Sequence, residues 1–376
     1  RYRGRVVVML DNDAAGRSHA RDMAAALREA GITCIEAEYP AWWPVDCDEA
    51  DPAAQWAADG GRFGSFLKAE ETRARQTVPV EADFEKLPSG LFSAASIALA
   101  LRDGRHTQEA LPTGIASLDE ALGGGFYPGL SILGAPSGCG KTALALQVAE
   151  NAASNGVPVL FATLEQPAYE LVARGVARRC GLLGVPIGAR RAMDSGTLRG
   201  MEAEAFNRAL TTYVEEVGAE MVFMDRPGAF SAEGVADEAR ALARSSGRAP
   251  LVVVDYLQLL AAERGEVERQ AVTRSVIALK AISKELECPV LAISSLNRGG
   301  YRSAAMDAFK ESGSVEYTAD LLLALSEHTG RGEKRPGRDA VRAVDVCVLK
   351  NRFGPAGGAT DPISLAFEPA SGHFRG

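Results

Sequence analysis

Short apolar runs alternate with helical stretches along the chain after Pro112. The apolar runs, which are typical of buried strands, lie at residues 130–135, 157–165, 220–225, 249–260, 288–295 and 320–327. Between them, stretches such as 142–156 and 272–287 have the composition and spacing of helices. Apolar strands joined by crossover helices predict an α/β fold, with a mostly parallel sheet covered by helices on both faces.

The residues before Pro112 have a different pattern. Residues 5–10 form an apolar run, a helical stretch then ends at Gly31, and residues 33–39 form a second strand-like piece. This order predicts one β-α-β unit. Residues 89–104 predict an amphipathic helix within a charged, helix-prone linker. We therefore expect three parts, which are residues 1–64, a helical linker at 65–110 and an α/β domain at 111–376.

The composition narrows the class of protein. The chain has 376 residues, of which 47% are hydrophobic and 24% charged, as in ordinary globular proteins. Its net charge of −8 argues against a protein that coats nucleic acid with its whole surface. No apolar run is long enough for a bilayer, and the six cysteines lack zinc-site spacing, so we expect no membrane partner and a reducing cytoplasm. Because the chain begins at Arg1 rather than Met, we expect a piece of a longer protein.

The segment "SILGAPSGCGKTALALQ" places a glycine-rich loop between a strand and a helix. Such loops bind phosphate oxygens through backbone amides and the positive end of the following helix. Lys141 is expected to reach the terminal phosphates of a nucleotide, and the Thr142 hydroxyl to bind Mg²⁺. The strict pattern has glycine at position 135, where this chain has Ala135. The predicted nucleotide-binding residues are Ser137, Gly138, Cys139, Gly140, Lys141 and Thr142.

Two carboxylates follow apolar strands downstream of this loop. Within 249–260, an apolar strand ends in Asp255, which is suited to hold Mg²⁺ through water. Glu165 ends the next strand after the loop helix, where a carboxylate can polarise a water behind the γ-phosphate. Taken singly, apolar strands that end in Asp are common, and the helix dipole alone favours Glu at a helix start. The phosphate loop upstream favours a nucleotide site for both.

The late segment "CVLKNRFGP" predicts a short strand that ends in a turn and carries Lys350 and Arg352. At a strand's period of two, both side chains leave the same face. Charges on an edge strand commonly serve only to prevent aggregation. The segment by itself leaves this interpretation open beside a catalytic one.

Taken in order, these segments resemble the RecA-like motor domain of hexameric replicative helicases, which are the DnaB type and related bacteriophage and mitochondrial primase-helicases. The resemblance covers about residues 110–376 and rests on "LPTGIASLDEALGGGFYPG", "LFATLEQPAYELVAR", "LVVVDYLQLL", "LKAISKELECPVLAISSLNR", "FKESGSVEYTADLLL" and "VLKNRFGP". It implies an ATP- and Mg²⁺-dependent DNA helicase that forms a ring, hexameric in the family. Such a ring moves 5′ to 3′ on single-stranded DNA, hydrolyses ATP between subunits, and has a primase or loader as partner.

The resemblance also implies roles for single residues. Lys350 and Arg352 match the cations that reach the γ-phosphate bound to the neighbouring subunit, an arginine finger in trans worth ~10³–10⁵ in rate. Ser295 stands where the family usually has a Gln or His that senses the γ-phosphate. The segment "KESGS" matches the channel loop that grips single-stranded DNA through its phosphates. The DNA-binding residues implied are Arg298, Lys310, Glu311, Ser312 and Gly313, with Arg302 as a further candidate.

The N-terminal segment "VVVMLDNDAAGRS" resembles the DxD element of a TOPRIM domain. Asp11 and Asp13 lie two apart after a strand, which implies a Mg²⁺ site, although a helix-capping pair without metal is an equal alternative. The TOPRIM pattern also needs a glutamate on an earlier strand, and no zinc-binding cysteine set is present. Primer synthesis by these residues is therefore not expected, and residues 1–64 are a partial TOPRIM-like segment.

Two other classes stay open at this point. A recombinase- or clock-type RecA ATPase acts on DNA or protein without unwinding, and "TGIASLDEALGGGFYPG" is widespread in that superfamily. A nucleotide-binding scaffold subunit without turnover would be compatible with Ser295. The segments "DYLQLL" and "KESGS", together with Lys350 and Arg352, favour the helicase.

Overall fold

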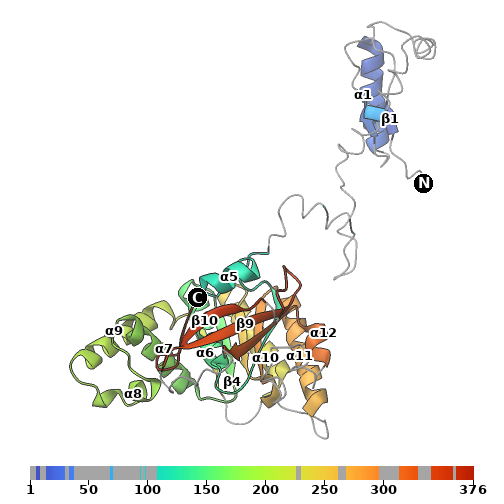
Figure 1. The fold of residues 1–376 in the computed structure, drawn as a ribbon. Helices are drawn as coiled ribbons and strands as arrows, with labels where there is room; N and C mark the ends of the chain where they lie inside the picture. Colours follow the sequence, from blue (N-terminus) through green and yellow to red (C-terminus); the bar gives the residue numbers. More distant parts are fainter. Residues whose placement is uncertain are drawn as a thin grey trace. The chain divides into compact units, whose positions relative to one another are not determined.

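The computed structural model divides the chain into two units, Arg1–Thr107 and Gln108–Gly376 (Figure 1). The structure describes residues 6–8, 14–29, 34–37, 68–70, 94, 98, 108–225, 230–260, 268–295, 313–328, 340–358 and 361–376. The boundary between the units lies close to the predicted start of the α/β domain. Among the helices in these ranges, none is long and apolar enough to cross a membrane.

The first unit contains the predicted β-α-β arrangement. Strand β1 (Val6–Val8) pairs in parallel with β2 (Cys34–Glu36), and helix α1 (Ala14–Glu29) connects them. Val8, Ala20, Ala24 and Cys34 form its small buried cluster. The Asp11 and Asp13 pair lies outside the described residues, as does the predicted linker helix apart from residues 94 and 98.

The second unit is built on one sheet, whose nine strands follow the order β11-β10-β9-β8-β3-β7-β6-β4-β5 in the part described. The strands are β3 (Gly129–Ala135), β4 (Val159–Thr163), β5 (Met221–Met224), β6 (Leu251–Asp255), β7 (Pro289–Ser295), β8 (Leu321–Glu327), β9 (Arg342–Asn351), β10 (Ile363–Glu368) and β11 (His373–Arg375). From β8 to β5 all neighbours run parallel, whereas β9, β10 and β11 continue the β8 edge in antiparallel fashion. The predicted mostly parallel sheet is confirmed.

Helices cover both faces of this sheet (Figure 1). They are α5 (Ala116–Leu122), α6 (Lys141–Ser154), α7 (Ala168–Leu182), α8 (Ala189–Met193), α9 (Met201–Glu216), α10 (Ala232–Ser246), α11 (Glu268–Glu285) and α12 (Gly313–Thr318). Helix α6 packs on one face, with α7 and α9 beyond it, and α10 and α11 pack on the other face. The predicted coverage by helices on both faces is also confirmed.

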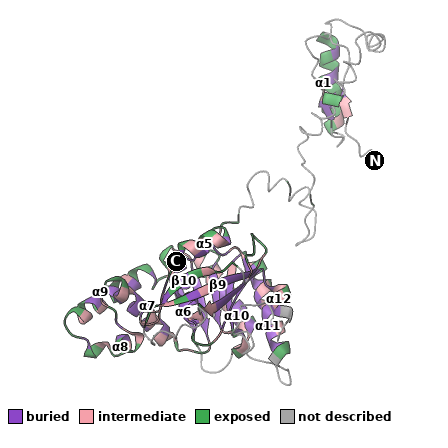
Figure 2. Ribbon diagram, viewed as in Figure 1, coloured by how far each residue is buried: buried purple, intermediate pink, exposed green. Residues whose placement is uncertain are grey.

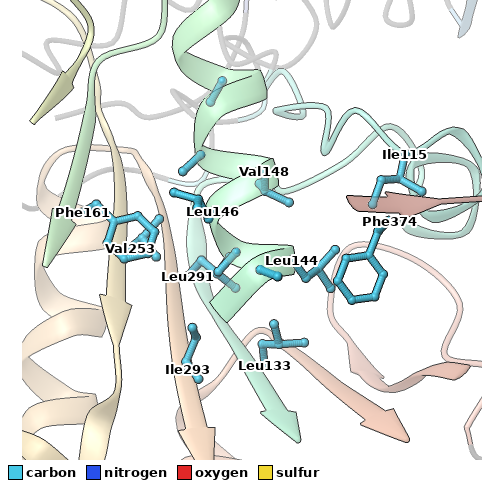
Figure 3. Packing of buried hydrophobic residues seen from close by; sticks show 14 of the residues in the cluster. Ile115, Leu133, Leu144, Leu146, Val148, Phe161, Val253, Leu291, Ile293 and Phe374 are labelled. Carbon is cyan, nitrogen blue, oxygen red and sulfur yellow. The ribbon is translucent and has the colours of Figure 1, made fainter. Parts of the chain in front are cut away.

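Two buried apolar clusters fill the spaces between the sheet and its helices (Figure 2). Because neighbouring residues of a strand face opposite sides, Leu133 belongs to the cluster around α6 and Ile132 to the cluster around α11. Figure 3 shows Leu144 of α6 beside Leu133 of β3 and Phe374 of β11. Helix α6 is buried over most of its length, so the loop that precedes it is held by a rigid base.

Candidate nucleotide site

The loop between β3 and α6 has the geometry of a phosphate cradle. Gly138 and Gly140 have φ values of +84° and +90°, which other residues rarely adopt. A Cβ at Gly140 would lie 2.8 Å from Cζ of Phe374, whereas a Cβ at Gly138 would meet open space. Gly140 therefore lets the loop rest on the β11 side, and Gly138 keeps the opposite side open for a ligand. The first amides of α6 have no acceptor within the helix and suit an anion.

A pocket of about 410 Å³ opens over this loop. Its lining includes Ser137, Gly138, Gly140, Lys141, Thr142 and Glu165, all of which the sequence assigns to the nucleotide site. The side chain of Cys139 is buried and does not line the pocket. The structure thus brings these residues together, and a role for Cys139 falls to its backbone.

Asp255 is a fully buried carboxylate at the end of β6. Neither of its carboxylate oxygens has a hydrogen-bond partner among the described residues. Burial, together with the negative charge of Glu165, raises the pKa of Asp255 to about 6. The Thr142 hydroxyl and the Lys141 charge oppose this rise, but the hydroxyl does not reach good hydrogen-bond geometry. The site therefore contains two unused carboxylate oxygens that favour a cation.

Thr142 and Asp255 fit Mg²⁺ only together with a nucleotide. Among the residues described, no group of three or more His, Cys, Asp and Glu could hold a metal ion by itself. Mg²⁺ typically keeps several waters and is bound through one or two carboxylates plus phosphates of the substrate. A buried carboxylate with unused oxygens, next to a hydroxyl at the start of the loop helix, meets this requirement.

Glu165 lies beside Asp255 because their strands are neighbours in the sheet. Thr163 of β4 pairs with Asp255 of β6, and the amide of Leu164 donates to the Asp255 carbonyl oxygen at 2.9 Å. Strand β4 follows the loop helix along the chain, but in the sheet β7 and β6 separate it from β3. Glu165 therefore enters the pocket from the side of Asp255.

Ser295 is the last residue of β7, between the strands of the phosphate loop and of Asp255. The side-chain amide of Gln258 donates to Ser294 Oγ at 3.0 Å, and its Oε1 accepts from the Ser295 amide at 3.3 Å. Gln258 therefore ties the segment after β6 to the end of β7. The sequence analysis missed Gln258, although a polar residue in "DYLQLL", three positions after Asp255, was a usable signal.

Lys350 and Arg352 lie toward the opposite end of the parallel strands from the phosphate loop. Lys350 of β9 pairs with Leu322 at the start of β8, and the Arg352 amide donates to the Asp320 carbonyl oxygen at 2.9 Å. Through β8, Lys350 is level with Ile132 and Arg352 with Leu130, so both lie toward the start of β3, whereas the phosphate loop follows its end. At ~3.3 Å per residue, these levels lie roughly 10 and 16 Å before the end of β3, and β8 also separates β9 from β3. Within one chain the two cations therefore do not reach the phosphate loop.

Both cations have partners within the chain at this end of the strands. Lys350 Nζ donates to the carbonyl oxygens of Glu316 and Tyr317, at 2.7 and 3.2 Å, in the last turn of α12. Partial burial, and then the charge of Arg352, lower the pKa of Lys350 below its ordinary value. Arg352 Nη1 lies 3.1 Å from Asp320 Oδ1, while 55% of the Arg352 side chain is exposed.

The comparison with known protein families covers both the phosphate loop and the Lys350–Arg352 strand. Residues 110–376 match the model of the DnaB-like helicase C-terminal domain. The chain belongs to this family. The match includes the phosphate loop, both carboxylates and the Lys350–Arg352 strand, so all parts of the candidate site lie within the family's domain.

Individual relatives give the same result. The replicative DNA helicase DnaB of Leifsonia xyli subsp. xyli is 32% identical over 284 residues, which cover 73% of this chain and 57% of that protein. DnaB of Pasteurella multocida is 29% identical over 292 residues, with the same two coverages of 73% and 57%. The chain thus spans a little over half the length of these curated relatives.

Two solved structures share the fold. The ATPase domain of G40P has a TM-score of 0.65 and 23% sequence identity, and the match covers 77% of this chain and 99% of that domain. A DnaB-like replicative helicase, studied for its interactions with primase, has a TM-score of 0.64 and 20% identity, with coverages of 96% and 79%. The predicted RecA-like fold is confirmed by these similarities.

The segment predicted to bind DNA falls mostly outside the described residues. Arg298, Arg302, Lys310, Glu311 and Ser312 lie there, and Gly313 begins α12. The structure therefore fixes only the helix that follows this segment.

The far side of the nucleotide pocket consists of residues that the sequence analysis did not assign. Arg174 of α7 lines it and, through its charge, lowers the pKa of Asp255. Arg342 and the turn Pro369–Gly372, between β10 and β11, complete the wall. Arg174 ends the segment "LFATLEQPAYELVAR", whereas the turn gave no signal because only the antiparallel extension brings it to the loop.

Proposed function

We propose that this chain is the motor part of a replicative-type DNA helicase, which hydrolyses ATP between the subunits of a ring and moves along single-stranded DNA. One observation carries the proposal. The phosphate loop and the Lys350–Arg352 pair lie at opposite ends of β3, so an active site that uses both requires two copies of the chain. Membership of the DnaB-like family supports the same reading.

In the proposed site, the loop amides and Lys141 bind the phosphates of ATP, and Thr142 and Asp255 hold Mg²⁺. When bound, Mg²⁺ would supply positive charge that neutralises the charge developing on the transferred phosphoryl group. Glu165 enters the same pocket and orients the attacking water, whose proton it accepts. Ser295, held at the end of β7 by Gln258, occupies the place of the γ-phosphate sensor.

Lys350 and Arg352 act on the nucleotide of the next subunit. Cations that arrive from a neighbour make hydrolysis depend on assembly, because they stabilise the transition state by a typical factor of ~10³–10⁵. A contact that joins one surface of a subunit to a different surface of the next is head-to-tail, and such contacts form rings when the rotation between subunits closes. A hexamer is the ring that the family implies.

The remaining partners follow from the family resemblance. Arg298, Lys310, Glu311, Ser312 and Gly313 grip single-stranded DNA in the channel, through phosphates and without regard to sequence. Translocation is 5′ to 3′, and a primase or loader acts with the ring in the cytoplasm. Asp11 and Asp13 of the TOPRIM-like segment are a second place for Mg²⁺.

The test combines ATP turnover, with and without single-stranded DNA, and unwinding of a forked duplex. The parent protein should hydrolyse ATP faster with DNA and should displace a strand. Glu165→Gln should lower turnover by about 10²-fold or more and keep nucleotide binding, because Glu165 acts on the water. Arg244→Ala, an exposed change on α10, is the control.

The other classes give different results in these assays. DNA-stimulated turnover without strand displacement would identify a RecA-type ATPase that does not unwind. A parent protein without turnover, and unchanged by Glu165→Gln, would identify a scaffold subunit.

A further inference from the structure

Asp320 is a buried anion that holds Arg352 in two ways. It lies directly before β8 with a relative exposure of 3%. Its Oδ1 accepts from Arg352 Nη1 at 3.1 Å, and its backbone carbonyl accepts from the Arg352 amide at 2.9 Å. One residue therefore fixes both the backbone and the guanidinium of Arg352.

The Asp320 carboxylate is itself fixed without Arg352. Its Oδ2 accepts from the Leu130 amide of β3 at 2.8 Å and also binds Lys280 Nζ of α11. A Cβ at Gly129 would lie 2.7 Å from this oxygen, so the carboxylate rests against the backbone of β3. Elements on two sides thus set the position of Oδ1 before Arg352 binds to it.

Stability alone gives little reason for the contact with Arg352. Lys280 and the Leu130 amide already compensate the charge of Asp320, and both contacts are largely buried. The Arg352 side chain is 55% exposed, and ion pairs of exposed groups contribute little to stability. The contact matters for where the guanidinium points.

We propose that Asp320 is the positioning residue of the finger, which holds the Arg352 guanidinium at a fixed place with its other donors turned outward. A guanidinium has five N–H donors, and among the described residues the Arg352 guanidinium hydrogen-bonds only to Asp320. The free donors suit the phosphates of a nucleotide bound to the next subunit. This inference rests on the proposed function and adds to it the residue that orients the trans cation.

The neighbourhood of Asp320 also connects the finger to the DNA-binding segment. Lys350 binds the last turn of α12, and Asp320 follows α12 by two residues. Both cations are therefore attached to residues 316–320, which follow the segment implied to grip DNA by a few residues along the chain.

The test is Asp320→Asn, which keeps the size and an acceptor for Leu130 but removes the charge that orients Arg352. We expect kcat of the DNA-stimulated ATPase to fall about 10- to 100-fold, with KM for ATP and nucleotide-analogue affinity within about twofold, because a misplaced finger affects the transition state. Glu150→Gln is the matched control. Glu150 is 2% exposed and pairs with Arg178 and Arg179, so its loss should lower stability without changing kcat.

Mixed assemblies separate positioning from a general structural role. Asp320→Asn protein mixed with Lys141→Ala protein should regain turnover, because the first supplies an intact loop and the second an intact finger. Mixed with Arg352→Ala protein it should regain none, since both lack the same half of the site. An unchanged kcat for Asp320→Asn, or no recovery with Lys141→Ala, would overturn the inference.

Two further arms keep the outcome decisive. If Asp320→Asn unfolds because Lys280 loses its partner, the double variant Lys280→Met/Asp320→Asn removes the unpaired charge and should show the same kcat and mixing pattern. A mixture of Arg352→Ala with Lys141→Ala runs in parallel. Recovery there without recovery for the Asp320 variants overturns this inference alone, whereas no recovery there overturns the proposed function as well.

Discussion

At the scale of single residues, Asp255 has the most costly environment in the described part of the site. It is fully buried, and neither carboxylate oxygen has a hydrogen-bond partner among the described residues. Burial raises its pKa from 3.8 to about 6, so its ionised form destabilises the folded protein by about 3 kcal/mol at neutral pH. Active sites often keep such strain because a ligand relieves it. Here Mg²⁺ bound with a nucleotide is the ligand that we propose.

Asp255→Asn should therefore stabilise the nucleotide-free protein and abolish ATP turnover. We expect the free energy of unfolding at pH 7.5 to rise by about 1–3 kcal/mol, less than the full amount because the new amide also lacks partners. The sign follows from the raised pKa. The folded state of the parent binds the proton more readily, so its penalty disappears as the pH falls from about 6 toward 4. Denaturant unfolding at pH 7.5 and at pH 5 should show the gain shrinking at the lower pH, and an equal gain at both would contradict the assignment.

At the scale of elements, the antiparallel extension holds the nucleotide pocket together. The Gln147 side chain of α6 donates to the Phe374 carbonyl oxygen at 2.9 Å and accepts from the Phe374 amide at 2.8 Å. The Phe374 ring stacks on Phe367 of β10, with centroids 4.4 Å apart, below Gly140 of the loop. The turn between β10 and β11 then forms one wall of the pocket. The end of the chain therefore shapes a site whose chemistry lies far earlier in the sequence.

Gln147→Ala should loosen this wall. The two Phe374 backbone groups lose their partner, which should lower the free energy of unfolding by about 1–3 kcal/mol. We expect KM for ATP to rise several-fold with kcat retained, because the wall binds nucleotide equally in the ground and transition states. Asn151→Ala is the control on the same helix, since Asn151 binds the Pro112 carbonyl oxygen away from the loop. A lower kcat with unchanged KM would contradict this role of β11.

The elements also show what the sequence can predict. Strands β3, β4 and β6 are buried on both faces, so they appear as continuous apolar runs that are easy to locate. Strand β10 alternates exposed and buried residues over a short length and β11 has three residues, so neither gave a clear pattern. Phosphate-loop and carboxylate positions follow locally from strand ends. The roles of Gln258 and Asp320 depend on contacts 37 and 190 residues away along the chain, which no local pattern contains.

At the scale of the whole molecule, the second unit carries the two halves of the proposed site toward opposite ends of its parallel strands. The loop, the side chains proposed to bind metal and the glutamate proposed to orient water lie toward one end of the parallel strands. The proposed finger and its proposed positioning residue lie toward the other end. The proposal therefore makes activity a property of the assembly rather than of the single chain.

Mixing inactive variants tests this arrangement. Arg352→Ala should lower ATP turnover by about 10³-fold with nucleotide affinity roughly intact, because a trans cation acts mainly on the transition state. Lys141→Ala should remove nucleotide binding. In an equal random mixture, about a quarter of the head-to-tail contacts join an intact loop to an intact finger, so turnover should return in part. Light scattering with and without an ATP analogue and single-stranded DNA would show the size of the mixed assembly. A single chain that hydrolyses ATP at full rate would refute the arrangement.

Because Lys141 and Arg352 lie apart in one chain, the proposed arrangement lets each copy supply its Arg352 to one neighbour and accept Arg352 from the other. An open filament then always has one complete active site fewer than it has subunits, because the phosphate loop at one end has no neighbour. Only a closed assembly lets the last Arg352 reach the first phosphate loop, so the proposed site favours a closed ring over an open filament.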